Sequence, residues 1–158
     1  MTQIMSERSM HLIDVENLYA THHEERIESW FAQFYRDVVG IGPSDLLTVA
    51  ADWRHALELG AVFPGARKLW GHGRDGADRE LMASIDWPSL ARGCDTLVIA
   101  SGDGCFVDAA YRARVLELRV VVVSRAESLS TCLASYADTV IEFPEFDPAV
   151  PPQFVRAA

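Results

Sequence analysis

Five apolar runs of strand length recur along this chain, and segments with helical periodicity separate them. The runs cover residues 10–14, 45–51, 67–70, 96–100 and 119–124. Parallel strands need a long crossover connection, which is usually a helix, so this alternation predicts a parallel sheet. The expected fold class is therefore α/β, with a mostly parallel sheet of five or six strands and helices on both faces.

The segments between the apolar runs predict where the helices lie. Helical patterns cover residues 24–39, 53–59 and 77–85, then a segment that ends near residue 116, and residues 130–136. Trp30, Phe31 and Phe34 follow helical spacing in the first of these segments, so we expect their side chains to pack in the core. Residues 139–143 fit a sixth strand at an edge of the sheet.

The chain has 158 residues, of which 49% are hydrophobic, and this size and composition are typical of one folded domain. We expect the domain to cover residues 1–146, and clustered prolines predict an extended or disordered tail at residues 147–158. No apolar run is long enough to cross a membrane, and the first residues lack a signal-peptide pattern. We therefore expect no membrane partner and a cytoplasmic location.

Three aspartates stand where the predicted strands end or the following helix begins. Asp14 ends the first run, Asp103 follows the fourth, and Asp78 opens the helix after the third. Each of them alone is also a common helix cap or turn former. Ligands of an open parallel sheet bind beyond the carboxyl ends of its strands, so we expect the three carboxylates to converge there. Converging carboxylates need a proton or a cation between them, and such oxygen ligands suit Mg²⁺ or Mn²⁺.

Three short motifs carry a resemblance to a known family. They are Asp14-Val-Glu-Asn17, Gly76-Ala-Asp78 and Ser101-Gly-Asp103-Gly-Cys-Phe106. In this order and spacing they resemble the NYN domain, a family of the PIN-like nucleases, over roughly residues 9–143. The resemblance implies a PIN-like Rossmannoid three-layer sandwich with the sheet order 3-2-1-4-5. It also implies metal-dependent hydrolysis of RNA.

The resemblance further implies roles for individual residues. Asp14, Asp78 and Asp103 would be catalytic metal ligands, and Asn17 would orient water or phosphate. Ser101 would help to hold the phosphate or the shell of the ion. The glycines around Asp103, Gly102 among them, would let the substrate backbone approach closely. RNA is the implied partner, and homodimerisation or recruitment by another protein stays open.

One departure from the family pattern concerns the loop that contains Asp103. The family usually has a second aspartate where this chain has Cys105. A neutral thiol is a poor ligand for Mg²⁺, so one ligand is missing unless Asp108, about one helical turn further on, reaches the same ion. The alternative is a catalytically impaired module that binds RNA or a protein partner.

Other signals in the sequence compete with this interpretation. Residues 71–76 spell G-x-G-x-x-G, but they follow the third strand and lack the acid that a dinucleotide site needs at the end of the next strand. We expect this loop instead to place His72 and Arg74 at the pocket rim, where they would bind substrate. The Asp14 motif is also similar to the opening of haloacid-dehalogenase-type phosphatases, although Glu16 replaces their second aspartate.

The net charge limits how an RNA could be bound. The formal value of −9 argues against a broadly basic surface for nucleic acid. Arginine supplies nearly all of the positive charge, since Lys68 is the only lysine, and arginine suits bidentate phosphate contacts. The charge therefore leaves a local phosphate site open.

Overall fold

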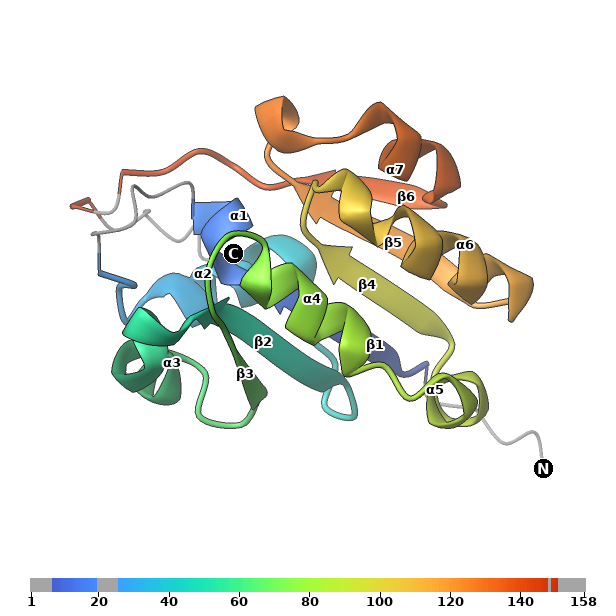
Figure 1. Ribbon diagram of the computed structural model, residues 1–158, viewed down its shortest axis with the longest axis horizontal. Helices are drawn as coiled ribbons and strands as arrows, with labels where there is room; N and C mark the ends of the chain where they lie inside the picture. Colours follow the sequence, from blue (N-terminus) through green and yellow to red (C-terminus); the bar gives the residue numbers. More distant parts are fainter. Residues whose placement is uncertain (1–6, 20–25, 148, 151–158) are drawn as a thin grey trace, which may run out of the picture.

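The computed structural model describes residues 7–19, 26–147 and 149–150, and these residues form one parallel sheet. Its six strands are β1 (Ser9–Asp14), β2 (Leu46–Asp52), β3 (Arg67–Gly71), β4 (Thr96–Ala100), β5 (Arg119–Ser124) and β6 (Thr139–Glu142). Their order is β3-β2-β1-β4-β5-β6, and every neighbouring pair is parallel (Figure 1). The predicted class and strand order are confirmed, and the sixth strand lies at the β5 edge.

Helices cover both faces of the sheet. One face carries α1 (Val15–Tyr19), α2 (Phe31–Val39) and α3 (Ala56–Val62), the last of which follows a 3₁₀ turn, η1 (Trp53–His55). The other carries α4 (Gly76–Ala83), α5 (Trp87–Gly93), α6 (Val107–Val115) and α7 (Thr131–Tyr136). Figure 1 shows α4 and α6 in front of the sheet, with α2 behind it. None of the helices in the described part of the chain has the length and apolar character needed to cross a bilayer.

Consecutive residues of each strand point to opposite faces and therefore enter different cores. In β1, Ile13 packs with α2 and α3, whereas Leu12 packs with α4 and α6. Both faces of the sheet are buried, which is why the strands read as continuous apolar runs. The result is the three-layer sandwich that the sequence predicts.

The helix predicted for residues 24–39 begins later than expected. Helix α2 starts at Phe31, while residues 26–30 are not helical and residues 24–25 lie outside the described part of the chain. The backbone N–H of Ile27 donates to Glu58 Oε2 (3.0 Å), and that of Glu28 donates to the Tyr19 hydroxyl (3.0 Å). Because distant side chains satisfy these donors, the segment gains nothing by forming a helical turn.

An aromatic cluster closes the face that α2 covers. Phe31 and Phe34 are buried and Trp30 is partly buried, which confirms the predicted core positions. Phe146, which follows β6, packs against the same three rings, and Phe143 packs against Phe31 and Phe34. Most of the predicted tail, residues 148 and 151–158, lies outside the described residues.

The end of β3 lies unusually close to the start of α4. A Cβ atom added to Gly71 would be 2.2 Å from the backbone nitrogen of Ala77. No side chain fits in that space, so only glycine lets the backbone of α4 approach the sheet this closely. The contact fixes the first turn of α4, and Asp78 with it, at the carboxyl edge of the sheet.

We predict that Gly71→Ala destabilises the protein by about 1–3 kcal/mol, because the added methyl group forces α4 away from β3. Gly60→Ala is the matched control: Gly60 lies in α3 and has no atom within 4 Å of an added Cβ. It should stabilise the protein by about 0.5–1 kcal/mol. Urea unfolding measures both changes, and equal midpoints for the two variants would contradict the close approach.

Candidate metal centre

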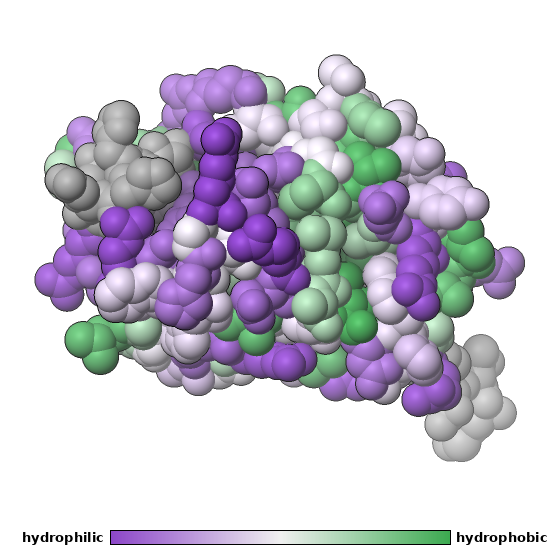
Figure 2. Space-filling model, viewed as in Figure 1, coloured by the Kyte–Doolittle hydropathy of each residue, from purple (hydrophilic) through white to green (hydrophobic). Residues whose placement is uncertain are grey.

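A cleft of about 720 Å³ opens at the carboxyl ends of β1, β2 and β4, beside the first turn of α4. Its lining is mostly charged: Asp14, Glu16, Asn17, Asp52, Arg54, Gly73, Arg74, Asp75, Gly76, Ala77, Asp78 and Asp103. Hydrophilic residues cover the loop before α4 and its N-terminal turn (Figure 2). The chain continues from β1 to β2 on one side and from β4 to β5 on the other, so the cleft lies at the topological switch point.

Two buried carboxyl groups meet in this cleft. Asp14 is 4% exposed and Asp78 is 6% exposed, and their carboxyl groups form a hydrogen bond with each other. Burial, followed by the contact with Asp78, raises the pKa of Asp14 well above its usual range. Burial also raises the pKa of Asp78, and the negative charge of Asp103 adds to the effect. The pair therefore needs a shared proton or a cation.

The β4–α6 loop brings Asp103 to the same place. The Ser101 hydroxyl donates to Asp14 Oδ2 (3.1 Å) and accepts from the backbone N–H of Asp103 (3.2 Å). Asp103 Oδ1 in turn accepts from the backbone N–H of Cys105 (2.8 Å), which caps the short turn of residues 104–106. Ser101 thus links the carboxylate of β1 to the loop that carries Asp103.

Gly102 and Asn17 join this loop to α1. The backbone N–H of Gly102 donates to Asn17 Oδ1 (3.0 Å), and the Asn17 carbonyl accepts from Arg125 Nε (3.0 Å). A Cβ atom on Gly102 would be 2.3 Å from the carbonyl oxygen of Ser128, so no larger residue fits there. The Asn17 side chain is consequently held against the loop, on one wall of the cleft.

The donor atoms suit a hard divalent cation. One ligand atom each from Asp78, Asp103 and Cys105 lies within 4.8 Å of the others, and Asp14 contacts Asp78. Desolvation and the charges of Asp78 and Asp103 raise the pKa of the Cys105 thiol far above its usual range, so this thiol is neutral in the metal-free protein. The carboxylate oxygens fit Mg²⁺ or Mn²⁺, which keep several water ligands, whereas a neutral thiol is a poor ligand for Mg²⁺.

The residues singled out in the sequence separate into two groups. Asp14, Asn17, Arg74, Asp78 and Asp103 line the cleft. The others do not belong to its lining: Ser101, Gly102, His72 and Asp108. Ser101 and Gly102 are buried behind the carboxylates, whereas the exposed Asp108 lies on the first turn of α6 and outside the ligand cluster. Their direct roles toward an ion or substrate remain predictions.

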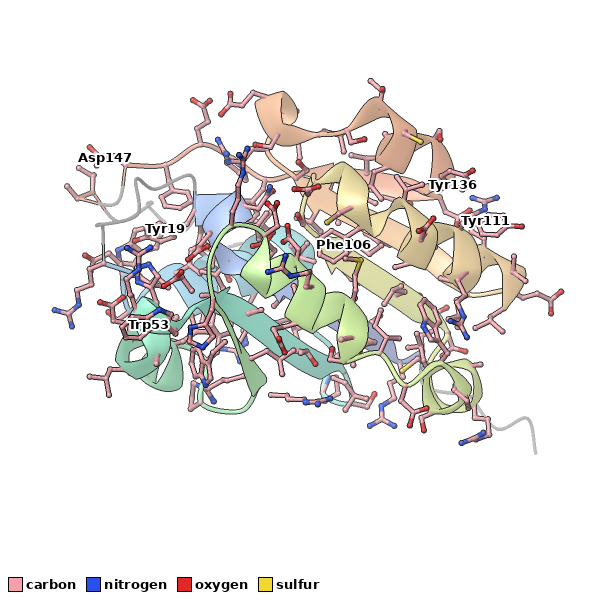
Figure 3. All side chains as sticks on the ribbon, in the orientation of Figure 1. Tyr19, Trp53, Phe106, Tyr111, Tyr136 and Asp147 are labelled. Carbon is pink, nitrogen blue, oxygen red and sulfur yellow. The ribbon has the colours of Figure 1, made fainter. Side chains whose placement is uncertain are left out.

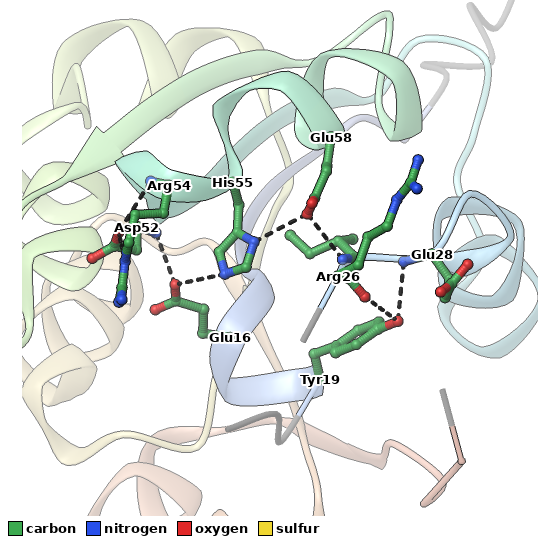
Figure 4. Close-up of polar contacts among 9 residues, drawn as sticks. Glu16, Tyr19, Arg26, Glu28, Asp52, Arg54, His55 and Glu58 are labelled. Carbon is green, nitrogen blue, oxygen red and sulfur yellow. Dashed lines mark hydrogen bonds and ion pairs between the residues drawn. The ribbon is translucent and has the colours of Figure 1, made fainter. Parts of the chain in front are cut away.

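Four charged residues that line the cleft were not among the predicted site residues, namely Glu16, Asp52, Arg54 and Asp75. Asp52 ends β2, so its position at the carboxyl edge was a usable signal. Glu16 Oε1 accepts from the backbone N–H of Asp52 (2.9 Å), and His55 Nε2 lies 3.9 Å from the same oxygen. His55 Nδ1 contacts Glu58 Oε2 at 3.0 Å, so a polar chain runs from the cleft to α3 (Figure 4).

The glycine-rich loop between β3 and α4 presents Arg74 to the cleft. Gly73 has φ 74° and Asp75 has φ 57°, which places Arg74 between two left-handed residues. Asp75 makes no side-chain cap for α4, and it lines the cleft. Aspartate tolerates this conformation better than most residues do, and the loop needs no bound dinucleotide to explain its glycines.

A parallel three-layer sandwich with an acidic cleft at its switch point is the arrangement of the PIN-like nuclease class. The family model of the NYN domain matches residues 8–144, and the chain therefore belongs to the NYN domain family. This confirms the resemblance of the three motifs. Membership of this family supports a nuclease kind of function.

Solved structures add evidence on the fold. A crystal structure of a protein of unknown function from Vibrio parahaemolyticus superposes with a TM-score of 0.64 at 19% sequence identity. The alignment covers 92% of this chain and 98% of that one. A comparison with curated proteins found no match. At this identity the likeness shows a shared fold alone.

We predict that Asp78→Asn stabilises the protein when it is purified free of metal. An asparagine amide donates to Asp14 without a shared proton and removes one negative charge from the cleft, so the melting temperature should rise by about 2–4 °C. Glu80→Gln, an exposed change on the same helix, is the control and should leave the melting temperature unchanged. A lower melting temperature for Asp78→Asn in the presence of EDTA would show that the two carboxyls do not repel each other.

Proposed function

We propose that this protein is a divalent-cation-dependent ribonuclease that hydrolyses RNA phosphodiester bonds in the cleft. The observation that carries the proposal is the contact between the buried Asp14 and Asp78, with Asp103 beside them. A fold gains no stability from placing like charges together, so the arrangement is best explained by a ligand that the charges bind. Membership of the NYN family supports phosphodiester hydrolysis as the reaction.

Asp14, Asp78 and Asp103 are the residues that would hold the cation. Mg²⁺ or Mn²⁺ bound there would act as a Lewis acid on the phosphate and stabilise the charge that develops during hydrolysis. The Ser101 hydroxyl and the amide of Cys105 each bond one oxygen of these carboxylates, which fixes their orientation before any ligand arrives. The second oxygen of Asp14 is also held, because Oδ1 accepts from the backbone N–H of Asn17 (3.4 Å).

Other lining residues suit the substrate phosphate and the attacking water. Arg74 is exposed at the rim, and its guanidinium group can make two parallel contacts with phosphate oxygens. Arg54 lines the same cleft and is held by Asp52 at 2.8 Å. Asn17 also lines the cleft, where its side-chain amide would orient water or phosphate.

Cleavage of end-labelled single-stranded RNA with Mn²⁺, Mg²⁺ or EDTA tests the proposal. We expect cleavage with either metal and none with EDTA. Asp103→Asn should lower the rate at least about one hundredfold. Loss of a metal ligand should reduce activity at least as much as loss of a residue that only hydrogen-bonds to a ligand. An asparagine oxygen can still accept from the Cys105 amide, so this variant should keep its fold. Metal-independent cleavage, or equal rates for Asp103→Asn and Glu80→Gln, would refute the proposal.

A second candidate function is a catalytically impaired module that binds RNA or a protein partner. The observation in its favour is the neutral Cys105 thiol among Asp78 and Asp103, where the family usually has another aspartate. The two candidate functions predict different effects of an aspartate at position 105 on the rate of RNA cleavage.

Under the ribonuclease proposal, Cys105→Asp should raise Mg²⁺-dependent cleavage about tenfold or less, because three carboxylates already bind the ion. Cys105→Ser changes the thiol without adding charge and should leave the rate unchanged. Initial rates measured side by side distinguish the cases. An inactive natural protein that becomes active only as Cys105→Asp would favour the impaired module.

A further inference from the structure

The charge of the protein restricts how an RNA strand can be held next to the cleft. The formal net charge is −9, and the cleft lining contains five aspartates and glutamates besides Asp103 and only two arginines, Arg54 and Arg74. RNA-binding proteins normally gain affinity by releasing counterions from many phosphates. With only two arginines in its lining, the cleft needs another source of affinity, and base stacking supplies one without charge.

An exposed aromatic pair stands at the ends of β2 and β3. Trp53, in η1, is 53% exposed, and its ring stacks with that of His72 at a centroid distance of 6.1 Å and an interplanar angle of 28°. Trp53 lies at the periphery of the molecule, beside the start of α3 (Figure 3). Trp53 belongs to neither hydrophobic core cluster, so packing of the core does not account for its position.

The aromatic pair borders the cleft. Trp53 stands in the chain between Asp52 and Arg54, which both line the cleft, and His72 precedes the lining residue Gly73. The two segments come from neighbouring strands, since Asp52 pairs with Gly71. A strand whose phosphate contacts Arg54 or Arg74 would therefore carry its next base toward the Trp53 ring.

We infer that Trp53 and His72 form a base-stacking platform that binds an unpaired base of single-stranded RNA beside the cleft. The inference rests on the proposed function and adds the substrate class to it. A base in a duplex is already stacked on both faces, so the platform selects unpaired RNA over double-stranded RNA. Stacking is also tolerant of sequence, because every base has a π face.

Binding and cleavage of one short RNA, single-stranded or in a duplex, test the platform. Binding is followed by the anisotropy of an end-labelled strand in EDTA, and cleavage is followed with Mn²⁺. Trp53→Ala should weaken binding of the single strand about ten- to one hundredfold and raise KM with little change in kcat. Trp53→Phe, which keeps an aromatic face, should recover most of the affinity.

Two controls separate stacking from a general loss of exposed apolar surface. Leu57 is 93% exposed on α3, and Tyr111 is 55% exposed on α6. Leu57→Ala and Tyr111→Ala should bind the single strand within about twofold of the natural protein. The salt dependence provides a further check: two phosphate contacts predict a slope near −1.4 in a log–log plot, and Trp53→Ala should not change it.

The outcomes distinguish this inference from the proposed function. Cleavage of single-stranded RNA with equal KM for the natural protein and Trp53→Ala overturns the platform and leaves the nuclease intact. Binding that depends on Trp53 without any cleavage supports the platform and refutes the nuclease. No binding of the single strand, or a change of oligomeric state in Trp53→Ala that points to a protein-docking surface, overturns the platform.

Discussion

The contact between the buried carboxyl groups of Asp14 and Asp78 is the interaction on which the rest of this account depends. It is unfavourable by itself, because burial and mutual repulsion both oppose ionisation of the pair. A bound cation would neutralise the repulsion between the two carboxylates, so the same geometry would then favour binding. Natural domains commonly accept such local instability at functional sites, and the surrounding structure must then hold the groups in place.

That support comes from close backbone packing and from single hydrogen bonds at the ends of strands. Gly71 lets α4 approach β3 closely, which positions Asp78 in the cleft. Gly102 lets the loop after β4 lie against Ser128, which positions Asp103 there. The hydroxyl of Ser101 then ties both strands of the switch point together. The cleft is thus a consequence of how the central strands end and of how closely the first turn of α4 packs against β3.

Much of this arrangement could be predicted from the sequence. The apolar runs specify the strands, and the positions of Asp14 at the end of one run and of Asp103 shortly after another place both at one edge. The features that could not be predicted from the sequence have physical causes. Residues 26–30 have a helical pattern, yet their amides bond to side chains that are distant in sequence, and no local rule anticipates such partners. The same holds for Glu16, whose place in the cleft depends on the backbone of β2 and on His55.

Direct titration of the metal-free protein with Mn²⁺, followed by calorimetry or by the electron paramagnetic resonance of the free ion, tests the central claim most directly. We expect saturable binding to the natural protein, and binding at least about tenfold weaker in Asp14→Asn, which keeps the size of the side chain and its bond with Ser101 but removes its charge. Equal affinity of the two proteins for Mn²⁺, or no saturable binding by the natural protein, would contradict the claim that these carboxylates form a cation site.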